Sequence, residues 1–277
     1  MKLLFVTDLH GCERKYDRLF DVAKENKADI VINAGDLLPK DGDLFAQDKF
    51  ITKYLDNHLA RFNSAGIYYL CYLGNDDLRI FDKLFEETCK KYSFVICLAQ
   101  RKFNIGDFEF IGMNWVVDYP FRLKDRCRMD TDGYEFQEQF GTGLLSRPNG
   151  FHELDNWFAY VKTLPTIESE LKQLPFPKDM AHSVYVIHMP PGRLGLDKCI
   201  HGREVGSEAV YNFLKEYQPK FSLHGHIHES PEVTGHWYRK LGNTICIQPG
   251  QLNGFTYVTI DLSSMKFNRV VEDYKAA

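Results

Sequence analysis

Short apolar runs alternate along the first half of the chain with stretches whose apolar residues recur at helical spacing. In residues 12–27, for example, Tyr16, Leu19, Phe20 and Ala23 share one helical face. The alternation predicts an α/β domain with largely parallel strands. Five apolar runs have the length of buried strands: KLLFVT (2–7), DIVINA (29–34), IYYLCYL (67–73), SVYVI (183–187) and KFSL (220–223).

The second half of the chain departs from this alternation. Runs at 108–113 (FEFIGM), 244–247 (TICI) and 255–262 (FTYVTIDL) follow without intervening helices, which predicts partly antiparallel pairing and a second layer of sheet. Residues 114–181 form an aromatic, proline-punctuated stretch that is too long for a plain connector. We interpret it as a cap-like insertion over one face of a single domain spanning residues 1–277.

Composition narrows the class of protein. With 277 residues, 44% of them hydrophobic, the chain can bury a sizeable core. No run approaches the ~18 apolar residues of a membrane span, and the first residues lack a signal-peptide pattern, so we expect a cytoplasmic protein without a membrane partner. The net charge of −4 argues against non-specific nucleic-acid binding, although a local basic groove stays open as an alternative.

Oxygen and imidazole donors follow the strand-like runs. They are Asp8 and His10, Asp36 after Gly35, Asn75 after Gly74, His188, and His226 and His228 in the run HGHIH. Strand carboxyl ends converge at one edge of an α/β sheet, so these seven side chains are expected to form one cluster. Mixed nitrogen and oxygen donors suit Mn, Fe or Zn better than Ca or Mg, and seven donors are enough for two ions that share a carboxylate.

Each piece of this pattern also has an ordinary structural explanation. The stretch YLGNDD (72–77) can be a strand-to-helix turn with an Asn or Asp cap, and His188 alone can be a hydrogen-bonded core histidine. In HGHIH, however, His226 and His228 alternate and are expected to point to the same side. The occurrence of all pieces at successive strand ends favours a metal site.

Together these blocks resemble the signature blocks of the calcineurin-like metallophosphoesterase superfamily. Residues 119–125 (YPFRLKD), 188–207, 223–231 (LHGHIHESP) and 247–251 (IQPGQ) further resemble its bacterial Icc-related branch. The resemblance implies an α/β sandwich of two mixed β-sheets flanked by helices. It also implies two divalent ions, Mn with Fe or Zn as alternatives, at the strand ends.

The resemblance also implies which residues hold each ion. Asp8, His10, Asp36 and His228 would hold one ion, and Asn75, His188, His226 and the shared Asp36 the other. Two ions in this arrangement can clamp a phosphate group and activate a water molecule. The expected activity is hydrolysis of a small phosphomonoester or phosphodiester, a nucleotide being one option. The alternative is a non-hydrolytic metal-binding scaffold of the same fold.

Asp76 departs from the family pattern, which usually places a histidine there that is credited with protonating the leaving group. We take Asp76, Asn75 and Asp36 as the candidate catalytic residues. A carboxyl group beside two dications is expected to be ionised at neutral pH. We therefore expect aryl or phosphoryl leaving groups to be handled better than alkyl ones.

The predicted insertion supplies candidates for substrate binding. Arg122 and Lys124 lie among Trp115, Tyr119 and Phe121, a mixture that can stack a base and neutralise phosphate. The alternative is an exposed loop with its own small core. His201, which follows the His188 run, is a further candidate for the same rim.

Overall fold

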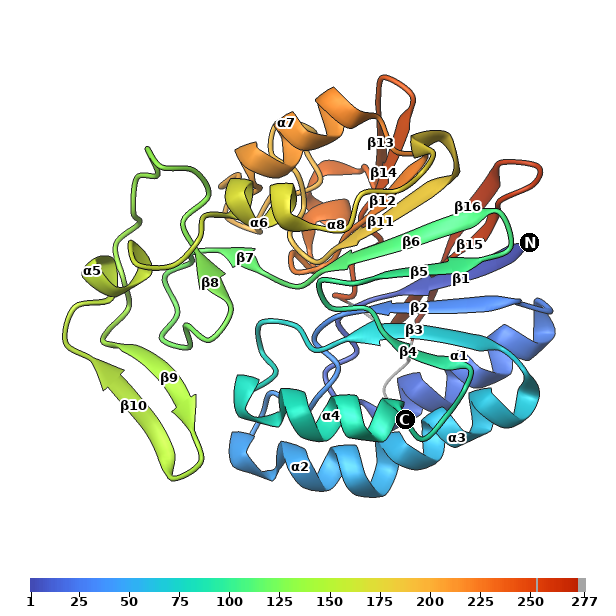
Figure 1. Cartoon of the computed structure of the whole chain (residues 1–277), viewed down its shortest axis with the longest axis horizontal. Helices are drawn as coiled ribbons and strands as arrows, with labels where there is room; N and C mark the ends of the chain where they lie inside the picture. The colour runs from blue at the N-terminus through green and yellow to red at the C-terminus, as the bar shows by residue number, and fades with distance from the viewer. Residues whose placement is uncertain (253, 274–277) are drawn as a thin grey trace.

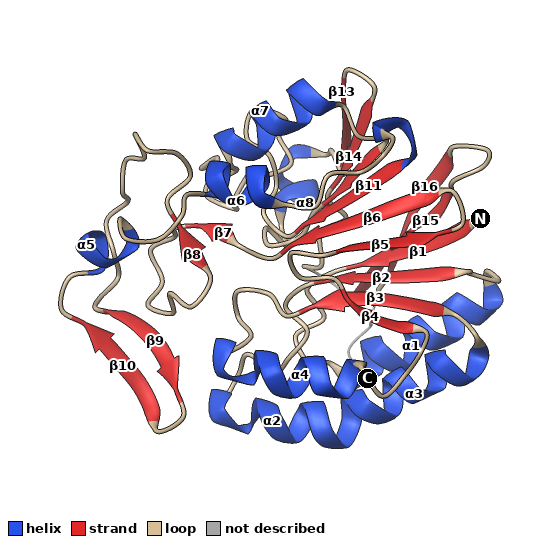
Figure 2. Ribbon diagram, viewed as in Figure 1, coloured by secondary structure: helices blue, strands red, loops and turns tan. Residues whose placement is uncertain are grey.

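Two six-stranded β-sheets pack face to face in the computed structural model, which describes residues 1–252 and 254–273. Helices cover the outer face of each sheet (Figures 1 and 2). The predicted fold, a sandwich of two mixed sheets flanked by helices, is confirmed. All eight runs that the hydrophobic pattern marked as strands contain one.

The first sheet has the strand order β16-β15-β1-β2-β3-β4. The pairs β1·β2, β2·β3 and β3·β4 are parallel, whereas β15 runs antiparallel to both β1 and β16. Phe5 lies opposite Ile32 on one side and Val258 on the other. The strands are β1 (Lys2–Val6), β2 (Ile30–Ala34), β3 (Tyr68–Tyr72), β4 (Val95–Cys97), β15 (Phe255–Asp261) and β16 (Lys266–Glu272).

The second sheet has the order β13-β14-β12-β11-β6-β5. The run TICI forms β14, which pairs antiparallel with β13 but parallel with β12. The hairpin between β13 and β14 returns the chain to the direction of β12, so this part of the sheet is less antiparallel than expected. The strands are β5 (Lys102–Ile105), β6 (Phe108–Met113), β11 (Ser183–Ile187), β12 (Phe221–Leu223), β13 (Tyr238–Leu241) and β14 (Thr244–Ile247).

The strands near the middle of the sandwich are buried on both faces. Leu3 and Phe5 of β1 point into the layer between the sheets, where Val184 and Phe221 also lie. Leu4 and Val6 belong to the core under the helices of the first sheet. Burial on both faces explains why these strands read as continuous apolar runs rather than as alternating ones.

Helices of the first sheet include the one that the sequence predicts at 12–27, which spans Glu13–Glu25 and buries Tyr16 and Leu19. The helical stretch 47–65 was not predicted from the sequence, and its middle is the π-helical segment η2 (Phe50–Leu55). The helices are α1 (Glu13–Glu25), α2 (Gln47–Lys49), α3 (Asp56–Ala65), α4 (Asp82–Cys89), α5 (Trp157–Val161), α6 (Ile167–Gln173), α7 (Glu208–Tyr217) and α8 (Ser230–Thr234), with short 3₁₀ turns η1 (Leu44–Ala46), η3 (Arg79–Phe81) and η4 (Met180–His182).

Residues 114–181 connect β6 to β11, which are neighbouring parallel strands of the second sheet. Residues 116–161 of this segment extend beyond the carboxyl ends of the strands, at the left of Figure 1, whereas α6 packs against α7. Its elements besides α5 and α6 are two short strand pairs: β7 (Val116–Val117) with β8 (Cys127–Arg128), and β9 (Gly143–Arg147) with β10 (Gly150–Leu154).

Two observations concern the described residues as a whole. Among the described residues, no helix has the length and apolar character needed to cross a bilayer. The seven cysteines all lie in the described part of the chain as free thiols, and four of them are buried.

Candidate metal centre

The seven predicted ligands lie just past the carboxyl ends of five parallel strands. Asp8 follows β1, Asp36 follows β2 and Asn75 follows β3, all in the first sheet. His188 follows β11, and the HGHIH segment follows β12, in the second sheet. The two sheets therefore bring donors from opposite halves of the chain to one place.

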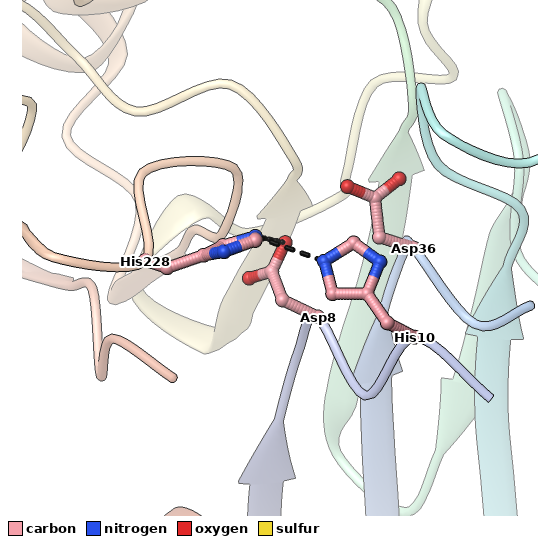
Figure 3. Close-up of side chains that lie close together, drawn as sticks. All are labelled: Asp8, His10, Asp36 and His228. Atoms are coloured by element: carbon pink, nitrogen blue, oxygen red, sulfur yellow. Dashed lines mark hydrogen bonds and ion pairs between the residues drawn. The ribbon is translucent and has the colours of Figure 1, made fainter. Parts of the chain in front are cut away.

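One group of donors consists of Asp8, His10, Asp36 and His228 (Figure 3), with one ligand atom of each within 4.8 Å of the others. His10 Nε2 lies 3.0 Å from His228 Nε2, and His228 Nε2 lies 3.3 Å from Asp8 Oδ1. Two ring nitrogens that face each other cannot both donate a proton to the contact. A cation between the donors would accept the lone pairs of both rings.

The second group consists of Asp36, His188 and His226. Asn75 completes it, because Asn75 Oδ1 lies 2.7 Å from His226 Nδ1 and 3.0 Å from His188 Nε2. His188 Nε2 is also 3.4 Å from Asp36 Oδ2. Asp36 thus belongs to both donor groups, which is the arrangement that the sequence predicts for a bridging carboxylate.

The hydrogen bonds of His188 test whether a cation fits this group. His188 Nδ1 lies 2.6 Å from the Ala34 carbonyl oxygen and donates its proton there. In the neutral ring, Nε2 then presents a lone pair to the oxygens of Asn75 and Asp36, none of which can donate a proton to it. A divalent cation among these atoms satisfies all of them. The donor set therefore fits a metal ion.

The protein groups alone hold the aspartates ionised. Burial by itself would raise the pKa of Asp8, but His228 and His188 outweigh it and lower this pKa to about 2. The pKa of Asp36 is likewise lowered despite burial, chiefly by His188 and His10. Two buried carboxylates in their charged form provide the negative charge that a cation site needs.

The pKa values of the ligand imidazoles are shifted in opposite directions. Burial lowers the pKa of His10 to about 4 and that of His226 to about 3, so both rings are neutral at pH 7. Burial also acts against charge on His188, but the carboxylates of Asp36 and Asp8 raise its pKa to about 9. His188 therefore holds a proton that a cation would displace.

The backbone of four ligands is left-handed. The φ angles are 57° at Asp8, 45° at His10, 53° at Asp36 and 72° at His226. Such conformations cost roughly 1–2 kcal/mol for a residue with a side chain and cluster at functional sites. The local strain turns each side chain from the end of its strand toward the cluster.

Glycines beside the ligands allow a close approach of the loops. A methyl group on Gly74 would lie 2.2 Å from both the backbone nitrogen and Oδ1 of Asp36, and one on Gly225 would lie 2.1 Å from Thr7 Oγ1. A Cβ atom at Gly74 would displace Asp36, and one at Gly225 would displace the side chain of Thr7. This close approach, rather than turn flexibility, explains the glycine that precedes Asn75 and His226.

Asp76 forms hydrogen bonds with two predicted ligands. Its backbone N–H donates to Asp36 Oδ1 at 2.9 Å, and its Oδ1 accepts from Asn75 Nδ2 at 2.9 Å. The second contact turns the amide oxygen of Asn75 toward His226 and His188. With a third of the side chain exposed, burial and then the Asp36 carboxylate raise the pKa of Asp76 to about 7. Two nearby dications would act in the opposite direction.

Asp77 and Arg126 support the site, a role that was not predicted for either residue. Asp77 accepts backbone N–H bonds from Leu37, Leu38 and Gly74 at 2.7 to 2.9 Å. Arg126 Nε donates to the Gly74 carbonyl at 2.7 Å. These contacts tie the loop after β2 to the loop after β3. The only local feature of the sequence that could have indicated the role of Asp77 is the pair of successive aspartates in YLGNDD.

The predicted substrate-binding residues lie in different environments. Lys124 is fully buried, 2.8 Å from Asp118 Oδ1, so its ammonium group would have to leave this ion pair to reach a ligand. Arg122 is exposed on the segment 114–181 and contacts Glu153 at 3.0 Å. His201 is exposed, and the neighbouring Ile200 N–H donates to Glu229 beside the HGHIH segment. Their binding roles stay predictions.

The fold and the donor cluster together define a sandwich protein with a metal-type site at its strand ends. The chain belongs to the calcineurin-like phosphoesterase family, whose model matches residues 1–230. The Icc-related branch stays a prediction.

Solved structures share this fold. One that is 20% identical aligns over 99% of both chains with a TM-score of 0.63. TT1561 of Thermus thermophilus is 15% identical over 98% of both chains, with a TM-score of 0.59. A dimetal phosphatase from Danio rerio is 10% identical over 94% of this chain and 91% of that chain, with a TM-score of 0.50. None of the curated proteins compared with the chain matches it.

Proposed function

We propose that this protein is a dinuclear metal-dependent phosphoesterase that hydrolyses a small phosphomonoester or phosphodiester. One ion is held by Asp8, His10, Asp36 and His228, and the other by Asp36, Asn75, His188 and His226. The observation that carries the proposal is the membership of Asp36 in both donor groups. A single carboxylate shared in this way is the bridge that a two-ion site requires.

The donor set favours a particular kind of ion. Four imidazoles with two carboxylates and one amide suit Mn²⁺, with Fe²⁺ or Zn²⁺ as alternatives, better than Ca²⁺ or Mg²⁺. Two such ions would lower the pKa of a coordinated water and neutralise charge on the phosphate group.

The chain's own residues contribute orientation and charge to this reaction. Asp36 and Asp8 supply buried negative charge, and Asn75 presents its amide oxygen because its nitrogen donates to Asp76. Two bound cations would favour the ionised form of Asp76, which would then have no proton to give to the departing oxygen. Substrates with stable, low-pKa leaving groups are therefore expected to react fastest.

The test combines metal content with turnover. Wild-type protein should bind two Mn²⁺ ions and release p-nitrophenol from mono- or bis-p-nitrophenyl phosphate. Asp36→Asn should lower the occupancy of both ions and reduce turnover by about 100-fold, because one residue serves both positions. His10→Ala should chiefly remove one ion.

Two outcomes would contradict the proposal. An Asp36→Asn protein that keeps two ions and near-normal turnover would refute the bridging role. Metal binding by the wild type without turnover of either substrate would instead favour the non-hydrolytic scaffold.

A further inference from the structure

A row of aromatic rings leads outward from the candidate metal centre along the insertion. The Tyr119 ring lies 5.7 Å from the His226 ring, the Phe121 ring 5.9 Å from Tyr119, and the Phe140 ring 5.5 Å from Phe121. Tyr119 is half-buried, whereas Phe121 is 62% exposed and Phe140 is 68% exposed. We call Tyr119, Phe121 and Phe140 the aromatic row.

The backbone positions of the aromatic row are set by hydrogen bonds between two segments of the insertion. Phe140 N–H donates to the Pro120 carbonyl at 2.8 Å, and Leu144 N–H donates to the Arg122 carbonyl at 2.8 Å. Tyr119 Oη donates to the Leu123 carbonyl at 2.9 Å. The rings therefore stand on a cross-linked platform rather than on a free loop.

A buried polar network around Asp118 packs beside this platform. Asp118 accepts from Lys124 Nζ at 2.8 Å, from Trp157 Nε1 at 3.0 Å and from Gln139 Nε2 at 3.0 Å. Lys124 Nζ also lies 5.0 Å from the centre of the Tyr119 ring. In this arrangement Lys124 lies against Tyr119, at the base of the aromatic row.

Exposed aromatic rings that touch one another beside a polar site are typical of a ligand-binding surface. Tyr119, the first ring of the row, contacts the predicted ligand His226. A group that lies on the row is therefore close to a phosphate bound at the candidate metal centre. Its ring spacings of 5.5 to 5.9 Å fall within the range in which aromatic rings interact favourably. A planar ring system joined to the phosphate matches this layout.

We propose that the aromatic row binds the nucleobase of a phosphate ester whose phosphate occupies the candidate metal centre. The inference rests on the proposed function and specifies its substrate class. The position of the row next to His226 favours a small ester over a protein partner, since only a group attached to the phosphate must lie there.

Two diesters with the same leaving group test the inference. Thymidine 5′-(p-nitrophenyl phosphate) carries a base, whereas methyl p-nitrophenyl phosphate does not, so the ratio of their KM values reports on binding of the base. Wild-type protein should favour the thymidine ester. Phe121→Ala should reduce that preference about tenfold, as expected for one lost stacking contact, and Phe121→Leu should reduce it nearly as much because the ring is lost.

Phe176→Ala is the matched control, since Phe176 is 56% exposed but contacts Tyr217 instead of the row. Its KM ratio should equal that of the wild type. A wild-type ratio near one, or a ratio that Phe121→Ala and Phe140→Ala leave unchanged, would overturn the inference and point to a macromolecular partner on the row.

Equilibrium titration with thymidine 5′-phosphate separates this inference from the proposed function. Phe121→Ala should weaken binding about tenfold relative to wild type and to Phe176→Ala. Such a loss would support the aromatic row even if neither diester were cleaved, in which case only the proposed hydrolysis would fail. Wild-type protein that does not bind the nucleotide, or Phe121→Ala protein that binds it equally well, would refute the inference.

Discussion

The structure indicates a role for Asp76 that differs from the one expected from the sequence. In the sequence it stands where the family usually has a histidine, so its expected consequence was a missing proton donor. In the structure it contacts Asn75 Nδ2 through Oδ1 and Asp36 Oδ1 through its backbone N–H. Asp76 thus acts on the ligands as a positioning residue, whatever its protonation.

This role predicts a defect in metal binding that excess metal corrects. Asp76→Ala should raise the Kd of the ion at Asn75 about tenfold, since it releases the amide, while Asp76→Asn keeps an acceptor oxygen and should change Kd less. At saturating Mn²⁺, Asp76→Ala should hydrolyse p-nitrophenyl phosphate at nearly the wild-type rate, because this leaving group needs no proton. Lost turnover with both ions bound would show that Asp76 acts on the nucleophile directly.

His188 gives the site a pH dependence of defined sign. Its pKa is raised to about 9 by Asp36 and Asp8 against the effect of burial, so at pH 7 a cation at Nε2 must displace one proton. The Kd of that ion should fall about tenfold per pH unit from pH 7 to 9 and level off above pH 9.

Calorimetric titration with Mn²⁺ in buffers of different ionisation enthalpy measures the released proton. His10→Ala is the control, because burial lowers the pKa of His10 to about 4 and this ring is already neutral at pH 7. The variant should lose affinity for one ion but keep the proton release of the other. A Kd that does not change between pH 7 and 9 would contradict the assignment of His188.

At the scale of elements, the segment 114–181 between β6 and β11 is held by charges that the sequence pattern does not pair. Lys124 and Asp118 are six residues apart and form a fully buried ion pair that also includes Trp157. Arg122, two residues before Lys124, is exposed and pairs with Glu153. The two basic residues look alike in the sequence, but one is exposed and the other is fully buried.

The difference predicts unequal stabilities on mutation. Lys124→Met should lower the free energy of unfolding by about 3–5 kcal/mol, because Asp118 is left buried without its cation. Arg122→Ala, which breaks an exposed pair, should cost less than about 1 kcal/mol. Adding Asp118→Asn to Lys124→Met should recover part of the loss. Urea denaturation measures all three, and equal costs for the two single variants would refute the buried pair.

At the scale of the whole molecule, the candidate metal centre joins the two sheets. Asp8, Asp36 and Asn75 come from the first sheet, and His188, His226 and His228 follow strands of the second. Ions bound there would link the two halves of the sandwich. Metal binding should therefore stabilise the entire fold and not only the loops.

We expect Mn²⁺ at about 100 times its Kd to raise the thermal midpoint by roughly 5 °C or more, since binding at each site adds about 2.7 kcal/mol to the free energy of unfolding. Calorimetry should show the rise reversed by EDTA and largely absent in Asp36→Asn. An Asp36→Asn protein that gains as much as the wild type would contradict a site shared between the sheets.

What the sequence determined by itself was the set of strands and the donors that follow them. Buried strands read as continuous apolar runs, and each run is local, so the five parallel strands before the donors could be recognised without knowledge of their neighbours. The family blocks then indicated which donors belong together. The cluster of Asp8, Asp36 and His188 was predictable for this reason.

Only the tertiary structure decided what surrounds those donors. The contact of Tyr119 with His226, the burial of Lys124 beside Asp118, and the bond from Asn75 to Asp76 depend on how loops from both sheets and the insertion pack together. Such contacts carry no period along the chain. Burial, and with it the pKa of His188, is a property of the assembled neighbours and not of the residue that the sequence names.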